Sequence, residues 1–374
     1  MQMKYFNFLL LMYFYCNPLF AQDGDDYLHS YCKAGTSIYG YKDAKGSIKI
    51  PAQFEGLPPA SKFRNIVAVT EAVNYKSYYL LRNGQKVGKD SVYISDMTYD
   101  CEQEGMIRFR DPKEDKVGFL GRDGKVVIPA VYNDAGPFHS GLALVLHDGK
   151  RICADGTPYI VNACEHWIWE GTTALINDRG DVVADSINLT DTENLNWYSY
   201  KTSDRQADTT IYTSLKVKGN RYLTFINYQK EFTNWFYQHF LTGLLEGNLS
   251  DNCFEEVTVE EHWKHRLRKK YSKVSFSKKY GTILQERMSS IKQNKVETII
   301  FREELNAIIF ENKAFQPYYT DCDEPNSAQF PAFEIMTENF DTRQQTSYQE
   351  HFSFLRTANG YKLIAIALGP HASP

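Results

Sequence analysis

The residues with the clearest potential for metal chemistry are two neighbouring histidines that follow an acid. Glu261, His262 and His265 lie close together, and histidines three apart on a helix can share one metal ion. The zinc-protease pattern needs His-Glu-x-x-His instead, with the two histidines four apart and the glutamate between them. Lysines and arginines surround the segment and oppose a bound cation. We therefore expect neither a metal site nor a cofactor.

Motifs for other enzyme classes are missing from the sequence. It contains no Gly-x-Ser-x-Gly nucleophile elbow, no P-loop and no Gly-x-Gly-x-x-Gly dinucleotide fingerprint. Two functions stay open on this basis. The chain is a non-enzymatic binding or interaction protein, or it is an enzyme whose acid–base pair lies in the C-terminal half without a motif to mark it.

A run of basic residues is the main candidate binding site. Its members are Arg268, Lys269, Lys270 and Lys273. We expect a helix over residues 257–271, with Glu260 and Lys264 paired at i,i+4 and the acids at the start complementing the helix dipole. The cations would then contact an anionic partner such as a phosphate, a lipid headgroup or a polyanionic glycan, or form a solvated face balanced by those acids.

The cysteines bear on the compartment and on two cross-links. The chain has seven cysteines, and those after Cys16 form an even set, which in an exported chain suggests disulfides. We expect Cys153 to pair with Cys164 across a hairpin, and Cys253 to pair with Cys322 because both lie in the C-terminal region. The alternative is that several are buried free thiols.

The first residues have the form of a secretory signal peptide. Lys4 precedes an apolar run over residues 5–15, and the small Ala21 stands before a polar stretch, so residues 1–21 fit a cleavable leader. A membrane span needs about 20 apolar residues, and no other stretch supplies them. The net charge of −4 gives no preference for nucleic acid. We expect an exported protein without a transmembrane anchor after cleavage, whose partner is another envelope protein, a peptide or a glycan.

Glycines at nearly even spacing reveal a repeat in the N-terminal half. Gly46, Gly84 and Gly124 each lie between apolar runs, and Asn83 and Asp123 precede two of them. Asn-Gly and Asp-Gly between such runs predict β-hairpins with type I′ turns. A second strand follows in each unit after a slot held by Asn65, Gly105 or Gly141, residue types that tolerate left-handed backbone. One such unit cannot bury its apolar side alone, so several must stack.

The motif around these glycines resembles the WG-repeat family. Its parts are aromatic-Gly-aromatic, then Asp-x-x-Gly-Lys before an Ile-Pro pair, then a Gly-Leu-Ala-x-Val strand, with Tyr39 and Val117 at the position of the tryptophan. The resemblance covers roughly residues 36–150, with worn copies at Asp155-Gly156 and Arg179-Gly180. It implies a bacterial protein with an all-β binding or interaction module and no common chemistry.

The C-terminal region has a different pattern. We expect a β-repeat domain over residues 22–200, a linker over residues 201–217 and an α+β domain over residues 218–374, with helices packed on a curved antiparallel sheet. A helix is expected from Phe232 to Leu244 and stops at Gly247. Strands are expected at residues 296–301, 305–310, 330–336, 351–356 and 361–368. This order resembles NTF2-like domains, whose helices close a sheet over a pocket.

Overall fold

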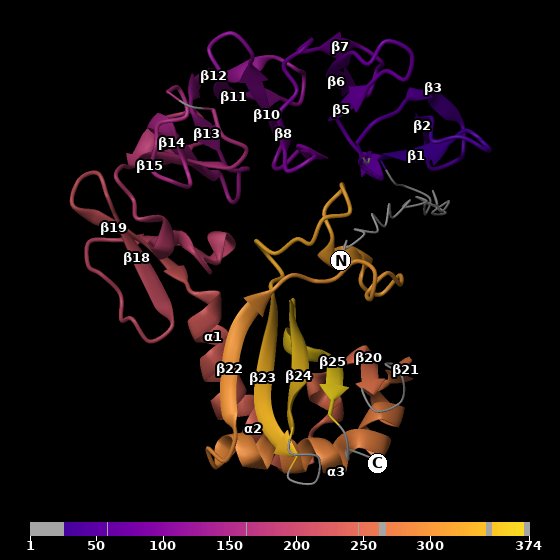
Figure 1. Cartoon of the computed structure of the whole chain (residues 1–374), viewed down its shortest axis with the longest axis vertical. Coiled ribbons are helices and arrows are strands. Elements are labelled where there is room, and N and C mark those ends of the chain that lie inside the picture. Colours follow the sequence, from indigo (N-terminus) through magenta and orange to yellow (C-terminus); the bar gives the residue numbers. More distant parts are fainter. Residues whose placement is uncertain are drawn as a thin grey trace, which may run out of the picture. The chain divides into compact units, whose positions relative to one another are not determined.

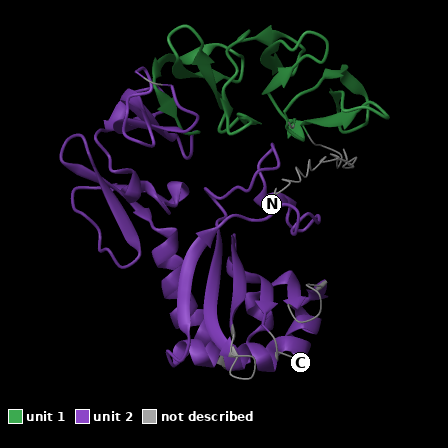
Figure 2. Cartoon of the chain, in the orientation of Figure 1, with its two compact units in different colours: residues 1–137 green, residues 138–374 purple. Residues whose placement is uncertain are grey.

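The computed structural model describes residues 26–57, 59–161, 163–245, 247–261, 267–341 and 346–369. The chain is mostly β-strand, in several antiparallel sheets with few helices (Figure 1). It divides into two compact units, residues 1–137 and 138–374 (Figure 2). The expected signal peptide lies outside the described residues. Within the described ranges, every helix is too short or too polar to cross a membrane.

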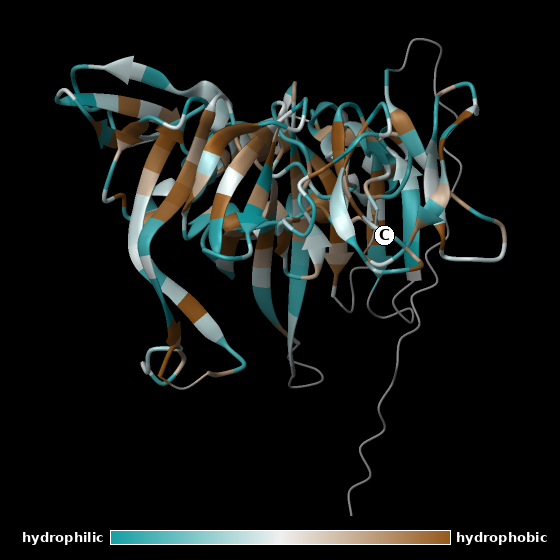
Figure 3. Cartoon of the chain, turned by 90° about the horizontal axis from the view of Figure 1, so that it is seen from above, coloured by the Kyte–Doolittle hydropathy of each residue, from teal (hydrophilic) through white to brown (hydrophobic). Residues whose placement is uncertain are grey.

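The first unit consists of short strands joined by tight turns. They are β1 Leu28–Cys32, β2 Tyr39–Lys42, β3 Ile48–Phe54, β4 Lys62–Phe63, β5 Ile66–Thr70, β6 Ser77–Leu81, β7 Lys86–Val87, β8 Ile94–Ser95, β9 Thr98–Tyr99, β10 Met106–Asp111, β11 Lys116–Gly121, β12 Val126–Tyr132 and β13 Asp134–Ala135. Small sheets form in the orders β3-β2-β1-β4, β5-β6-β7 and β10-β11-β12. Apolar and polar residues alternate along many strands (Figure 3), as half-buried strands require.

Hairpin turns of one geometry recur along the chain. In the turn before β12, the Gly124 amide donates to the Gly121 carbonyl and the Gly121 amide donates to the Lys125 carbonyl, both at 2.9 Å. The same two hydrogen bonds occur around Gly46, Gly84, Gly156 and Gly180, and all five glycines have positive φ. These are the glycines that the sequence places in turns.

The turn type differs from the expected one. A type I′ turn needs positive φ at both central residues. Asn83 and Asp123 do not have a positive φ, so only the glycine after each of them is left-handed. This is the three-residue hairpin loop, a type I turn followed by a left-handed glycine. Two consecutive left-handed residues occur instead in the second slot of the repeat, at Glu104-Gly105 and Ser140-Gly141. Asn65 in the corresponding slot is not left-handed.

A second glycine in each repeat is required by close backbone contact. A Cβ on Gly118 would lie 2.5 Å from the Ile128 carbonyl oxygen and 2.6 Å from the Ala130 nitrogen. A Cβ on Gly40 would meet the corresponding Ile50 oxygen at 2.5 Å. The ladders around both glycines also share their register and its irregularities. The Gly-aromatic element therefore specifies how closely two strands approach, whereas the later glycine specifies the turn.

We predict that Gly118→Ala destabilises the first unit by about 3 kcal/mol, because the new methyl group overlaps backbone atoms that cannot move independently. The matched control is Gly46→Ala, where a Cβ meets open space and only the positive φ of +82° is unfavourable, at about 1–2 kcal/mol. Urea unfolding followed by circular dichroism measures both. Equal losses for the two variants would show that the close approach is not the constraint.

The second unit begins with two further small sheets. Its elements are β14 Leu142–Cys153, β15 Trp167–Asn177, β16 Val182–Ala184, 3₁₀ turns at Leu189–Thr192 and Trp197–Ser199, β17 Lys201–Ser203, β18 Tyr212–Val217 and β19 Arg221–Ile226. Residues 201–217 are therefore not a linker. β17 and β18 both pair with β19, and Leu215 packs with Leu223 and Phe225 in a buried cluster. The polar residues 204–208 that suggested a linker form only the connection between strands.

The rest of the second unit combines helices with one larger sheet. Its elements are α1 Tyr228–Trp235, a π-helical segment Phe236–Phe240, α2 Leu241–Leu245, β20 Cys253–Glu261, β21 Leu267–Ser272, α3 Lys273–Lys292, β22 Glu297–Glu303, β23 Ala332–Asp341, β24 Thr346–Thr357 and β25 Gly360–Leu368. The strand order is β21-β20-β25-β24-β23-β22. All pairs are antiparallel except β20 with β25, which is parallel.

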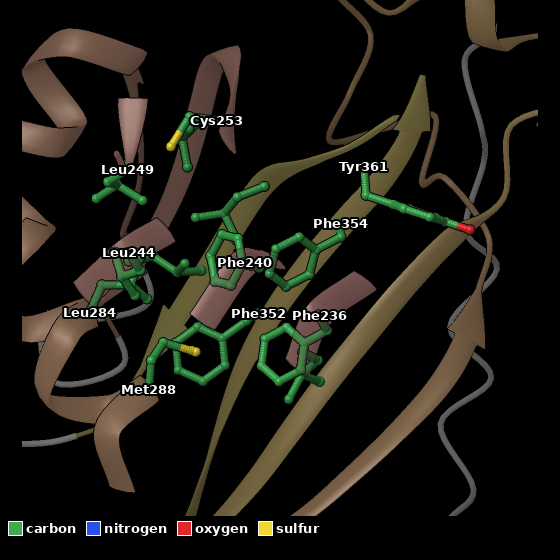
Figure 4. Close-up of a cluster of buried hydrophobic side chains, with 14 of the residues drawn as sticks. Phe236, Phe240, Leu244, Leu249, Cys253, Leu284, Met288, Phe352, Phe354 and Tyr361 are labelled. Atoms are coloured by element: carbon green, nitrogen blue, oxygen red, sulfur yellow. The ribbon is translucent and has the colours of Figure 1, made fainter. Parts of the chain in front are cut away.

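The helices and one face of this sheet share a core of aromatic side chains. Phe232 of α1 stacks on Phe333 of β23 with ring centroids 4.5 Å apart, and Phe240 meets Phe354 of β24 edge to face at 4.9 Å. Figure 4 shows this packing, with Met288 of α3 beside the rings. Burial of such rings is the largest apolar contribution available to a unit of this kind.

Two buried carboxylates of the sheet, Glu350 of β24 and Glu261 of β20, accept hydrogen bonds from side chains of α3. Glu350 is fully buried, receives the Arg287 Nε–H at 2.7 Å and accepts from the Gly369 amide at 3.1 Å. On β20, the Tyr280 hydroxyl of α3 donates to buried Glu261 at 2.8 Å. A buried carboxylate is tolerated only when it is paired in this way, so these contacts fix where α3 lies.

Two expected elements are wrong. Within the range 257–271, the described residues 257–261 and 267–271 lie on the antiparallel strands β20 and β21 and not on a helix, and the helix starts only at Lys273 after the cap Ser272. Residues 305–310 are not a strand. Leu305 and Phe310 are buried there in a cluster with Phe315 and Leu355, and the segment forms turns.

Candidate functional site

The basic run lies mainly on strand β21 and is opposed by glutamates of β20. Arg268 Nε lies 2.8 Å from a Glu260 carboxylate oxygen, and Lys270 Nζ lies 3.6 Å from Glu256. The strand register places Glu260 directly opposite Arg268, whereas Glu256 is the diagonal neighbour of Lys270 on the same face. Opposite charges across an antiparallel pair stabilise the hairpin modestly.

The remaining two cations of the run are separated from this face. Lys269 alternates to the other side of β21, and Lys273 begins α3, where it contacts Glu255 at 2.8 Å. The structure therefore does not gather the four residues into one unbalanced cationic surface. The signal for this arrangement is in the sequence: acids at 255–261 mirror bases at 268–273, as a hairpin pairs them.

The histidine pair considered for metal binding lies outside the described residues, which omit 262–266. In the described part of the chain, no group of three or more His, Cys, Asp or Glu side chains is placed to hold a metal ion.

One of the two expected disulfides is present and the other is wrong. Cys153 and Cys164 form a disulfide with Cα atoms 6.1 Å apart. Cys253 is a free thiol, buried in the helix–sheet core at the start of β20, and Cys322 is disulfide-bonded elsewhere. Burial raises the pKa of the Cys253 thiol to about 12, so the thiol stays protonated. Although Cys253 and Cys322 both lie in the C-terminal region, the fold does not pair them.

The space between helices and sheet, where a pocket was expected, is filled. Phe232, Phe236, Phe240, Phe352 and Phe354 all have essentially no exposed surface. Figure 4 shows the last four of these rings packed together. A hollow does lie along α3, lined in part by Gln285, Glu286 and Ser289. It does not reach the core.

A polar strip crosses the opposite face of the sheet. We define it as Glu334, His351, Ser353, Glu260 and Arg268. The register places Glu334 opposite Ser353, and the alternation of each strand directs these side chains away from the buried Phe333 and Phe352. The strip is the part of this face where a histidine, carboxylates and a hydroxyl lie together.

The centre of the strip is a histidine–carboxylate pair. His351 Nδ1 lies 2.5 Å from a Glu334 carboxylate oxygen, and the Ser353 hydroxyl donates to the other oxygen at 3.4 Å. The hydrogen bond that His351 donates to Glu334 raises the pKa of His351 above the ordinary value of about 6.5, with a smaller contribution from Glu260, and burial opposes this shift.

This geometry does not form a nucleophile–base pair. A catalytic serine donates its proton to the histidine, whereas Ser353 donates to the carboxylate that also holds His351. A raised histidine pKa also favours the charged form, which is a poor base. The arrangement is suited to an ion pair on the surface of the sheet.

The comparison with protein families agrees with the repeat geometry. The family described as WG containing repeat matches residues 118–150, which span β11, β12, β13 and most of β14. The chain thus carries a WG repeat in this segment. No curated protein matches the chain.

The pair between His351 and Glu334 predicts a pH dependence of stability. Because the folded pKa of His351 is raised, its contribution is fully present below the unfolded pKa and is lost as pH rises through the folded pKa. His351→Gln should therefore cost more at pH 5.5 than at pH 9. We expect the difference to be about 1 kcal/mol or less, since both side chains are partly exposed and solvent screens them.

Urea unfolding of the wild type and the variant at both pH values measures this difference. Glu334→Gln is the matched control: it should show the same pH dependence, and the double variant should add little to either single change. A His351→Gln effect that is equal at both pH values would show that the pair is not ionic in the folded protein.

Proposed function

We propose that this chain is an exported, non-enzymatic binding protein that acts through its outer surfaces. In this proposal a stacked array of β-hairpin repeats, over about residues 22–200, and a C-terminal α+β domain both serve recognition. Its compartment is the periplasm, the outer envelope or the exterior, and its partner is another envelope protein, a peptide or a glycan.

The observation that carries the proposal is the filled interior of the C-terminal part. An enzyme or a small-molecule carrier of this architecture would use the space between helices and sheet, but Phe240 and Phe354 occupy it edge to face at 4.9 Å. The strand order β21-β20-β25-β24-β23-β22, with the helices on one face, supports the proposed NTF2-like topology. Such a fold hosts both enzymes and binding domains, so it does not decide function.

Two further observations support the rest of the proposal. The five equivalent glycine turns and the WG repeat at residues 118–150 favour a repeat array, and repeat arrays commonly offer extended binding surfaces. The Cys153–Cys164 disulfide is compatible with an oxidising compartment and hence with export.

The alternative is an enzyme that uses the polar strip. The pair of His351 with Glu334 favours it, because histidine beside a carboxylate is a common acid–base arrangement. The shared carboxylate disfavours it, because Ser353 and His351 both bind Glu334 instead of each other.

Turnover assays decide between these functions. Purified full chain should give no hydrolysis of peptide, glycan or phosphoester substrates above that of a His351→Ala variant prepared in parallel. A rate that is present in the wild type and lost in both His351→Ala and Glu334→Gln would establish the enzyme instead. Circular dichroism of both variants ensures that lost activity is not lost folding.

A further inference from the structure

A group of aromatic side chains surrounds one arginine near the end of the β14–β15 ribbon where β14 ends and β15 begins. The Arg151 guanidinium carbon lies 4.4 Å from the ring centre of Trp167, 4.9 Å from that of Trp169 and 5.8 Å from that of Tyr159. All three distances are within the range of a cation–π contact. We call Tyr159, Trp167 and Trp169 the aromatic cage.

The rings of the cage stand at steep angles to one another. Trp167 and Trp169 meet at 80° with centroids 5.4 Å apart, and Tyr159 meets Trp167 at 63°. Rings in this arrangement form the walls of a corner. A planar guanidinium can stack flat on only one wall, whereas a rounded alkylated ammonium group contacts several walls at once.

The backbone fixes the cage in place. Arg151 pairs with Trp169 and Cys153 pairs with Trp167 in the β14–β15 register, so these side chains share one face of the ribbon. Tyr159 is held beside them because its amide donates to the Arg151 carbonyl at 2.9 Å, and the Cys153–Cys164 disulfide closes the intervening loop. The walls are therefore preorganised, and only the arginine side chain needs to move.

We propose that the aromatic cage is a binding site for an alkylated ammonium group of the choline type, which Arg151 occupies until a ligand replaces it. The negative faces of the rings attract any cation, and no hydrogen-bond donor is needed from the ligand. This proposal deepens the proposed binding function by naming a ligand class. Its assay measures binding alone, so its failure would leave the turnover comparison unaffected.

The ligand can be free or borne by a lipid headgroup. Ile160 and Val161 follow Tyr159 directly and are 94% and 74% exposed. Such aliphatic side chains contribute nothing to binding a free cation, but beside a headgroup they can enter the apolar part of a lipid surface. The two sources therefore differ in their dependence on Ile160 and Val161.

Titration with choline chloride, followed by tryptophan fluorescence at constant ionic strength, tests the cage. Arg151→Ala removes the internal competitor, so its dissociation constant should be at least tenfold lower than that of the wild type. Trp167→Ala in the Arg151→Ala background should abolish saturable binding. Lys150→Ala is the matched control, because this neighbouring cation alternates to the other face of the ribbon and its loss should leave wild-type affinity unchanged.

Two results would overturn the proposal. One is an Arg151→Ala variant that is folded, with its disulfide intact by mass spectrometry, and binds choline no better than the wild type. The other is that the Arg151→Ala variant binds guanidinium as tightly as choline. The rings would then serve only to pack around the arginine side chain of the chain itself.

Vesicles distinguish the source of the ligand. The Arg151→Ala protein is mixed with phosphatidylcholine vesicles and, separately, with phosphatidylglycerol vesicles that lack the ammonium group. A lipid-borne ligand is supported if the protein binds only phosphatidylcholine vesicles and this binding falls at least tenfold when Ile160→Asp and Val161→Asp are added. A free ligand is supported if the protein binds choline but does not bind vesicles. Val73→Asp, at a 92% exposed site in the first unit, is the matched control. Equal binding to both vesicle types, or to neither vesicles nor choline, overturns the proposal.

Discussion

The close approach of two backbones at a single glycine is the constraint on which the repeat geometry depends. At Gly118 and Gly40 the facing strand passes so near that any side chain would overlap its carbonyl and amide groups. This approach places Val117 opposite Tyr132 and Phe119 opposite Ile128, and all four side chains are buried. Without it the two strands could not bury the same pairs of residues.

The constraint also explains the aromatic residue that precedes this glycine. Tyr39, at the position that gives the repeat its name, is buried and packs against Tyr41 and Phe54. Val117 fills the equivalent position with no exposed surface. The position is therefore a core position, so replacing tryptophan there changes packing and does not remove a contact surface. In the proposed binding function, recognition therefore uses other residues.

Local signals located many elements, and long-range pairing decided the rest. The turn glycines and most C-terminal strands follow from residue types and from apolar periodicity, which act within a few positions. The segment 257–271 shows where local signals fail. Acids followed by bases can form ion pairs at i,i+4 in a helix or across the strands of a hairpin equally well. Only the partner strand β25 decides between them.

The candidate sites could not be predicted from the sequence, because each depends on the register of paired strands. His351 meets Glu334 because β23 and β24 pair in one register, and no spacing in the sequence marks that contact. The aromatic cage depends on the register of β14 with β15 and on a disulfide that turns the loop back. In both cases no motif in the sequence marks the residues, and only the pairing of distant strands brings them into contact.

The proposed binding function requires that the C-terminal interior is a solid core, so that a partner is recognised on outer surfaces. Calorimetric titration with benzene tests this directly. The wild type should show no saturable binding, whereas Phe240→Ala should gain it, because an apolar cavity left by a phenyl ring accepts such a ligand. If the wild type binds benzene saturably and Phe240→Trp loses this binding, the C-terminal interior contains a pocket and is not a solid core.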